Sequence, residues 1–546
     1  MFSVIRSRAV APAVWVLGLV GVLCVSLHLS AVGWSLLLVA GLLVLLSPRE
    51  TDPARPQLLS LRAEYAALVL IVLAAMFFRL WRLHGVPPGC WSDEAENGLE
   101  TLRILGGDWV VFTPRNGGRG SLQFFWTAPF FAALGANAFS LRLASAIVGI
   151  LTVPALWYLI KQWTPGRLGL YGAGFLALSS WHVIISRLGF DAVMVPLFDV
   201  LVVLAIVRGC RTGSLFWFGA AGLLAGVANY SYAAARLTPV LGAIAFLLFK
   251  STLPGRRRIW GAATAAMAFC IALAPLASYA LSHPADMTKR GARISVVSRV
   301  VEQRSLSPLA ENALATVRMF HETGDANGRH NVPGRPTLDL ISGLLFLAGL
   351  GAAWRRRWPR ESVLMIVWLA LELFFGGVLT DQAPHALRTI SAIVPVSFLV
   401  AWGCAAACSK ARGASAAWLA ILLALLVGGA TYRSYFIEYA GSEEVQRAFS
   451  PRASAVAEYL KAESAGQTVV VSFRLNRSVV AFLSGLDPAH LRFVDPAEMT
   501  PLPGALYVFS EQQEIPAWGR TSRYERDTIG KSGWQRFVVL RPAAEE

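Results

Sequence analysis

The sequence predicts an α-helical polytopic membrane protein with a small α/β domain at its C-terminal end. Of its 546 residues, 55% are hydrophobic and the mean hydropathy is +0.54, which is too apolar for a soluble protein. The formal charge of +16 lies mostly in short loops between apolar runs, where it sets orientation, so we expect no nucleic acid partner. The six cysteines show neither a disulfide framework nor the spacing of a zinc site, and we expect no metal cluster.

The apolar runs number about fourteen by the length criterion for spanning helices. They fall near residues 11–30, 32–47, 62–81, 121–135, 138–162, 166–185, 190–208, 214–231, 236–250, 259–281, 337–354, 361–380, 388–407 and 414–432. The run 121–135 is short and contains Pro129. If it lies in the membrane interface, the basic loops fall on the cytoplasmic side; if it spans, they fall outside. We therefore predict about thirteen spans, with interfacial helices in a first outer loop over residues 82–137.

Three parts follow from this pattern. Residues 1–61 form a transmembrane hairpin with a cytoplasmic link, and residues 62–439 form the main membrane domain, with a second large outer loop at 282–337. From about residue 440 the composition becomes that of a soluble protein: helix-like AVAEYLKAES precedes strand-like TVVVSF, LRFV, ALYVFS and RFVVL. Residues 440–546 are predicted to be a small extracytoplasmic α/β domain, on the same side as the polar loops.

The first outer loop holds the densest acidic group of the membrane half. Four carboxylates occur there, Asp93, Glu94, Glu96 and Glu100. If Ser92 caps a short helix, Asn97 and the carboxylates at 93, 96 and 100 share one face, and the apolar residues elsewhere predict an amphipathic helix on the membrane surface. Acidic residues also suit any exposed helix start. With the glycine-rich basic loop and aromatic run that follow, we interpret the segment as half of an active site with a carboxylate general base.

Arginines at the outer ends of spans form a second group: Arg119, Arg142, Arg187, Arg236 and Arg388. Each alone can place its charge among lipid headgroups, but several that converge on one loop would bind a phosphate well. Arg119 and Arg236, and then Arg388, are the preferred phosphate ligands. The arginines at 142 and 187 could equally pair with carboxylates.

Further candidates lie near the same surface. Asp191 either forms an i,i+4 ion pair with the arginine at 187 or positions substrate, and Tyr232 belongs either to the site or to an interfacial aromatic belt. Asp381 and His385 occupy a very short outer loop beside Arg388, which makes them candidate substrate ligands.

Three segments together resemble a known superfamily: DEAENGLETLRILGGDW, LGANAFSLRLASAIVGILTVPALWYL and SRLGFDAVMVPLFDVLVVLAIVR. The chain is similar to the dolichyl-phosphate-mannose protein mannosyltransferases, and within them to the bacterial branch with the lipid A aminoarabinose transferases. The resemblance is strong over residues about 62–250 and implies the glycosyltransferase C fold. The family's acidic pair matches Asp93 and Glu94, and its arginines and aspartate match positions 142, 187 and 191. Where those transferases have a lysine and two prolines, this chain has Arg119, Gly120 and Ser121.

The resemblance implies transfer of a sugar from a polyprenyl-phosphate carrier to a hydroxyl acceptor, with inversion, on the outer face of a bacterial-type plasma membrane. Asp93 would be the base, the outer arginines would neutralise the leaving phosphate, and a divalent cation on Asp93 and Glu94 is a minor alternative. The sugar and acceptor are not specified. Two other classes remain: a polytopic lipid or solute transporter, which needs charges near mid-span as at Glu372, and an inactive envelope assembly protein.

Overall fold

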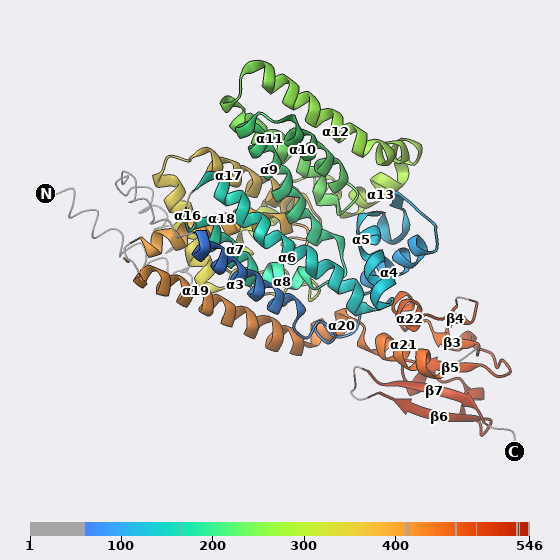
Figure 1. Ribbon diagram of the computed structural model, residues 1–546. Helices are drawn as coiled ribbons and strands as arrows, with labels where there is room; N and C mark the ends of the chain where they lie inside the picture. Colours follow the sequence, from blue (N-terminus) through green and yellow to red (C-terminus); the bar gives the residue numbers. More distant parts are fainter. Residues whose placement is uncertain are drawn as a thin grey trace.

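The computed structural model describes residues 61–543 except 165, 410, 412, 413, 465, 466, 488, 531, 532 and 534, and it describes no side chains at 61 and 289–293. The first two predicted spans, at 11–30 and 32–47, lie outside the described residues. Figure 1 shows a bundle of long helices with the C-terminal sheet at one end. The membrane-protein class predicted from the sequence is confirmed.

Eight helical stretches of the described part are long and apolar enough to cross a membrane. They are Arg62–Leu80, Ala138–Trp163, Asp191–Thr212, Ala233–Thr252, Gly255–Ser282, Arg360–Val378, Ile390–Cys408 and Ala414–Tyr439. The predicted run 166–185 is instead a pair, α7 (Leu168–Leu178) and α8 (Ser180–Ser186), bent by 58°. Two further predicted runs form shorter apolar helices, α10 (Leu215–Ala228) and α16 (Leu340–Arg355). Helices suit this setting because they satisfy backbone hydrogen bonds internally.

The principal helices of the bundle are α3 (Leu61–Leu80), α6 (Ala138–Trp163), α9 (Met194–Thr212), α11 (Thr238–Phe249), α12 (Gly255–Ser282), α17 (Arg360–Leu373), α18 (Ile393–Cys408) and α19 (Ala414–Tyr432). Their core is a continuous cluster of buried apolar side chains in which α6, α7, α9 and α18 are central. The loop after α12 carries α13 (Pro284–Ile294), α14 (Val297–Gln303) and α15 (Ser307–Arg318).

The first outer loop contains two helices and a short hairpin between them. Helix α4 (Ser92–Leu105) and helix α5 (Leu122–Leu134) are joined through strands β1 (Phe112–Thr113) and β2 (Arg119–Gly120). At a rise of about 1.5 Å per residue, α5 is roughly 20 Å long, which is shorter than the hydrocarbon core of a bilayer. This length agrees with the interfacial placement predicted for the run 121–135. In Figure 1 both helices lie at the same end of the bundle as α13.

The C-terminal part is a five-stranded mixed sheet in the order β4-β3-β5-β7-β6. The predicted strands are confirmed as β3 (Val469–Ser472), β4 (Leu491–Val494), β5 (Leu506–Phe509) and β7 (Phe537–Pro542), and the predicted helix as α21 (Pro451–Glu463). Strand β3 pairs in parallel with β4 and β5, and β7 pairs antiparallel with β5 and β6. The sequence analysis missed α20 (Glu443–Ala448), α22 (Arg477–Ser484) and the polar edge strand β6 (Tyr524–Ile529).

The C-terminal sheet domain packs directly on α4. Side chains of both parts share one apolar cluster, in which the Phe131 and Phe482 rings stack at 5.8 Å. Gly98 makes the contact possible, because a Cβ at this position would lie 2.3 Å from the Phe482 ring. Helix α4 contacts α5, α6 and α22, and half of its residues are buried. Its placement on a membrane surface stays a prediction.

Candidate active site

An ion pair between Asp93 and Arg119 forms the centre of the candidate site. Arg119 Nη2 lies 2.7 Å from Asp93 Oδ2, and Nη1 donates to Asn97 Oδ1 at 3.1 Å. The Asp93 side chain is 26% exposed, whereas that of Arg119 is 3% exposed. One carboxylate is thus held in a fixed orientation by a buried guanidinium and still reaches solvent.

The β1–β2 hairpin places Arg119 against α4. Thr113 pairs with Arg119 and Phe112 with Gly120 in the antiparallel register. A side chain at residue 120 would not fit, because its Cβ would lie 2.2 Å from the carbonyl oxygen of Tyr230. Leu122 N donates to the same carbonyl at 2.9 Å, so the hairpin is fixed to the outer end of α10. The glycine that follows Arg119 is therefore required by a close backbone approach.

Glu94, the neighbour of Asp93, has a different environment. It is fully buried and forms a bidentate pair with Arg142, through Nε to Oε1 at 2.9 Å and Nη2 to Oε2 at 2.8 Å. The backbone N–H groups of Trp91 and Gly189 donate to the same carboxylate at 3.0 and 2.8 Å. The expected Ser92 cap is wrong, because Trp91 precedes the helix and Glu94 satisfies its N–H.

These contacts revise the expectations for a catalytic Glu94, for a cation shared by Asp93 and Glu94, and for Arg142 as a substrate ligand. With four donors on its two oxygens, Glu94 has no free position for a reacting group or for a cation shared with Asp93. Arg142 also donates hydrogen bonds to the carbonyls of Pro87 and Gly89, at 2.9 and 2.7 Å. The pair therefore anchors the start of α4 to α6 and does not contact substrate.

Arg187 is also structural. It is fully buried and donates to the hydroxyl of Tyr435 at 3.0 Å and to the carbonyls of Phe78 and Val86 at 3.0 and 2.9 Å. The expectation that it binds substrate is wrong, because these bonds hold the turn after α8 against α3. The adjacent Asp191 is buried at the start of the short 3₁₀ turn Asp191–Val193.

A chain of aromatic contacts leads from the ion pair to the second outer loop. The Arg119 guanidinium lies 4.4 Å above the Phe190 ring, a cation–π distance, and Phe190 contacts Tyr232 at 5.8 Å. Phe190 also stacks on Trp91 at 5.1 Å, and Trp91 meets His330 edge-on at 5.7 Å. Asn97 Nδ2 donates to Gly189 O at 2.8 Å, which fixes the turn that carries Phe190.

Arg236 is exposed in the 3₁₀ helix Ala233–Leu237, four residues after the buried Tyr232. Of the arginines expected to bind phosphate, it is the one that the structure leaves at the surface. Arg388 instead pairs with Asp381 at 2.9 Å, and both side chains are partly exposed. Asp381 N donates to Ile294 O at 2.8 Å, and Asp286 O lies close to Gly118, so α13 connects the hairpin to the Asp381 loop.

A buried cluster of Asp325, His330 and His385 lies beside the aromatic chain, and we call it the Asp-His-His cluster. Asp325 Oδ2 is 3.4 Å from His330 Nδ1 and 3.8 Å from His385 Nδ1, and the two imidazoles stack at 4.9 Å. Ala386 N donates to Asp325 Oδ2 at 2.9 Å. His385 was expected to bind substrate, but it is 6% exposed and faces this cluster.

The cluster has donors suitable for a divalent metal. Its three ligand atoms lie within 4.8 Å of one another, and carboxylate with imidazole is a common zinc donor set. Burial and the positive charges of His330 and Arg388 hold the pKa of His385 well below its usual value. Burial raises the pKa of Asp325, but the hydrogen bond and charge of His330 outweigh it and lower the pKa overall. At neutral pH both groups are thus in the deprotonated forms that bind metals.

Several of these residues were not predicted from the sequence. Asn97 was placed on the correct helix face but given no partner, and Phe190 was read only as part of a turn. Asp325 and His330 lie five residues apart in a loop that seemed to lack a motif. The presence of two of the chain's eight histidines next to short polar turns could have indicated the cluster.

The comparisons with known proteins agree with this architecture. Residues 120–279 match the family model described as dolichyl-phosphate-mannose-protein mannosyltransferase. Among curated proteins, no sequence matches the chain. A similar solved structure is ArnT from Cupriavidus metallidurans in the apo state, with TM-score 0.57 and 14% identity over 88% of this chain and 98% of that one. The same protein bound to undecaprenyl phosphate gives TM-score 0.51 and 13% identity over the same shares.

The fold and site therefore define a class: a polytopic membrane protein with the fold of the lipid-dependent glycosyltransferases. More particularly, the chain has the glycosyltransferase C fold, shared with ArnT over nearly the whole length of both chains. The fold expectation drawn from the sequence resemblance is confirmed.

Proposed function

We propose that the protein is a glycosyltransferase that moves a sugar from a polyprenyl-phosphate carrier to a hydroxyl of an acceptor. The observation that carries the proposal is the partly exposed Asp93 carboxylate held by buried Arg119 at the outer end of a glycosyltransferase C bundle. ArnT, which shares the fold, is known bound to undecaprenyl phosphate, and this supports a polyprenyl phosphate as the carrier.

Asp93 acts as general base. It accepts the proton of the acceptor hydroxyl as the oxygen attacks the anomeric carbon, and the carrier phosphate leaves from the opposite face, so the configuration inverts. Arg119 positions the carboxylate, and Asn97 and Phe190 hold Arg119 in place. Arg236 and Arg388, which Asp381 holds in place, supply guanidinium donors for the departing phosphate.

The transfer takes place on the extracytoplasmic face of a bacterial-type plasma membrane. This orientation rests on the basic loops between spans, which are cytoplasmic when the first outer loop and the C-terminal domain lie outside. The carrier lipid lies along the helices, and the acceptor approaches from the side of the C-terminal domain.

The test is transfer of labelled sugar from a panel of undecaprenyl-phosphate sugars to membrane acceptors by the purified protein in nanodiscs. The Asp93→Asn variant is expected to lower the transfer rate by about 10²-fold or more, the usual contribution of a positioned general base. The matched control is Asp108→Asn, since Asp108 is an exposed carboxylate in the same loop that also pairs with an arginine, Arg103. The control is expected to keep the wild-type rate.

An unchanged rate in Asp93→Asn would show that another group takes the proton. Absence of transfer by the wild-type protein from every donor, together with movement of labelled undecaprenyl phosphate across proteoliposomes, would establish the transporter class instead. Absence of both activities would favour the assembly-protein reading.

A further inference from the structure

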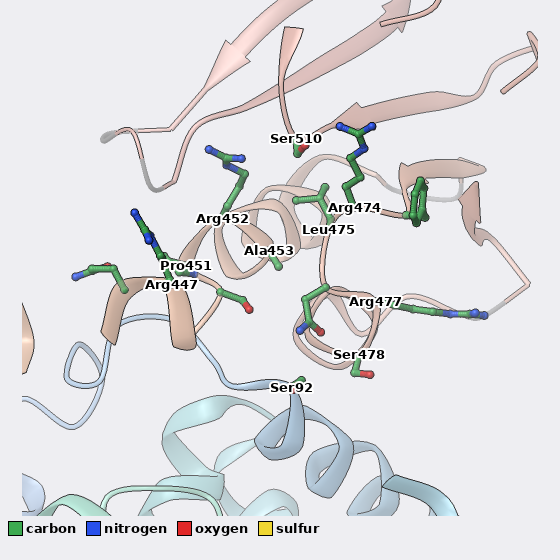
Figure 2. A pocket seen from close by; sticks show the side chains of 14 residues that line it. Ser92, Arg447, Pro451, Arg452, Ala453, Arg474, Leu475, Arg477, Ser478 and Ser510 are labelled. Atoms are coloured by element: carbon green, nitrogen blue, oxygen red, sulfur yellow. The ribbon is translucent and has the colours of Figure 1, made fainter. Parts of the chain in front are cut away.

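A cavity of about 680 Å³ lies between the C-terminal sheet domain and the start of α4, outside the candidate active site. Its lining comes from four parts of the chain: Ser92 on α4, residues 446–453 around α20 and α21, residues 473–478 after β3, and Ser510 after β5. Figure 2 shows the sheet on one side of the hollow and Ser92 on the other. The cavity therefore lies mainly in the C-terminal part of the chain, and Ser92 of the first outer loop contributes to one side of it.

The topology of the sheet places a ligand site at this position. Parallel strands β3 and β5 are neighbours, and both end at the cavity. The chain leaves β3 through α22 toward β4 on one side of the sheet, and it leaves β5 toward β7 and β6 on the other. In open α/β sheets, ligands bind outside the carboxyl ends of the strands where such connections diverge.

The lining is strongly basic. Among its described residues are four arginines, Arg447, Arg452, Arg474 and Arg477, and no acidic residue. Arg447 forms a close ion pair with Glu443 at 2.5 Å, whereas Arg452 and Arg474 have looser carboxylate neighbours, Glu511 at 3.6 Å and Glu514 at 3.8 Å, both beyond hydrogen-bond distance. In Figure 2 the Arg452 and Arg474 side chains extend toward Ser510. Guanidinium groups in this arrangement suit a phosphate or carboxylate.

Helix ends add to the positive potential. The N-termini of α4, α21 and α22 all border the cavity, through Ser92, Pro451 and Arg477 respectively. The partial positive charge at a helix start favours an anion. At α4 the carboxylates Asp93 and Glu94 offset this charge, so α21 and α22 make the contribution. Phe473 also lines the cavity and is 52% exposed, so it offers an apolar face beside the charges.

We propose that this cavity binds the anionic saccharide portion of the acceptor, a sugar that bears phosphate or carboxylate groups. The arginines hold its anionic group, and Phe473 and Asn476 contact its ring. The proposal rests on the proposed function in one respect: Ser92, in the cavity lining, directly precedes Asp93, so a bound acceptor is held next to the residue that takes its proton. Binding itself does not depend on transfer.

The experiment measures binding of glucose 6-phosphate, inorganic phosphate and glucose to the full-length protein in phosphatidylcholine nanodiscs by titration calorimetry. Glucose 6-phosphate is expected to bind most tightly, inorganic phosphate more weakly, and glucose not measurably. Arg452→Gln with Arg474→Gln is expected to weaken glucose 6-phosphate at least about tenfold, since charge-assisted bonds are lost. The control, Arg492→Gln with Arg526→Gln, changes two exposed arginines of the same domain outside the cavity and is expected to bind normally.

A second arm uses nanodiscs that contain phosphatidylglycerol. Competition by this lipid with glucose 6-phosphate would identify a lipid headgroup as the source of the anion, whereas no competition supports the saccharide. The inference is overturned if the Arg452 and Arg474 double variant, with an unchanged melting temperature, binds glucose 6-phosphate like the wild type. Asp93→Asn is expected to keep full binding, so failure of the cavity proposal and failure of the proposed transfer are separable. Where transfer is measured, the double variant should raise the acceptor KM and leave kcat unchanged.

Discussion

Replacement of Glu94 by glutamine tests whether Glu94 has a structural role while the adjacent Asp93 has the catalytic one. Glu94 accepts four hydrogen bonds, two from Arg142 and two from backbone N–H groups, and both charged side chains are buried. A glutamine carbonyl can accept only two of these bonds, and its NH₂ group faces donors. We therefore expect Glu94→Gln to destabilise the native protein more than Asp93→Asn, because Asp93 is partly exposed and pairs with one arginine, Arg119.

The magnitude follows from the contacts that are lost. Two buried donors lose their acceptor, which lowers the free energy of unfolding by about 1–3 kcal/mol each. The buried Arg142 charge also loses its counter-ion, and removal of one partner of a buried ion pair costs about 3–5 kcal/mol. These contributions overlap, so we expect about 3–5 kcal/mol in total. For a cooperative unit of about 150–250 residues, 3 kcal/mol corresponds to a fall in melting temperature of roughly 6–12 °C.

The assay is thermal unfolding of the detergent-solubilised protein, with labelled-sugar transfer measured on the same preparations. The combined variant Glu94→Gln with Arg142→Met removes the uncompensated charge, so it is expected to melt higher than the sum of the single effects predicts. The reasoning is refuted if Glu94→Gln melts like the wild type but loses transfer, because that result would assign Glu94 to the chemistry.

Two further predictions concern the docked domain and the Asp-His-His cluster. Gly98→Val would force a side chain into the Phe482 ring. We therefore expect faster proteolytic release of the C-terminal domain and a loss of about 1–3 kcal/mol of folding stability from overpacking. The control is Gly106→Ala, whose Cβ has ordinary contacts, and equal proteolysis of the two variants would contradict the docking. Zn²⁺ at 100 times its Kd is expected to stabilise the wild type by about 2.7 kcal/mol. The stabilisation is expected to disappear in His385→Ala and to remain in the surface variant His490→Ala. An equal effect of zinc on all three proteins would exclude the cluster as its site.

The sequence predicted the strongly patterned elements well, the apolar helices and the apolar strands. The predicted apolar runs in the described part all form helices: eight stretches and one bent pair pass the test for spanning a membrane, and three are shorter apolar helices. An apolar segment in a membrane must satisfy its backbone hydrogen bonds internally. The four strongest strand patterns of the C-terminal part were also correct. Strand β6 was missed because its exposed edge position gives it a charged sequence, YERDTI, without an apolar face.

Mid-span charge is one feature that the sequence left unexplained. Glu372 is buried in α17. One turn earlier on this helix, the Trp368 indole N–H donates to the Ser391 hydroxyl. The Ser391 hydroxyl in turn donates to Asp199 on α9. Asp199 was not noticed as a second buried carboxylate. Thr238 also donates to it, so two hydroxyl groups satisfy Asp199.

The amino-acid sequence by itself determined the membrane class, the fold and the loop that carries the candidate base, because hydropathy, charge bias and a local acidic motif are properties of neighbouring residues. Only the tertiary structure decided which carboxylate of that motif is open. Successive residues on a helix point about 100° apart, so packing against α6 buries Glu94 under Arg142 and leaves Asp93 partly exposed beside the buried Arg119. The docking of the C-terminal domain and the basic cavity beneath it likewise arise from contacts between segments more than 350 residues apart, such as that of Ser478 with Glu96, separated by 382 residues.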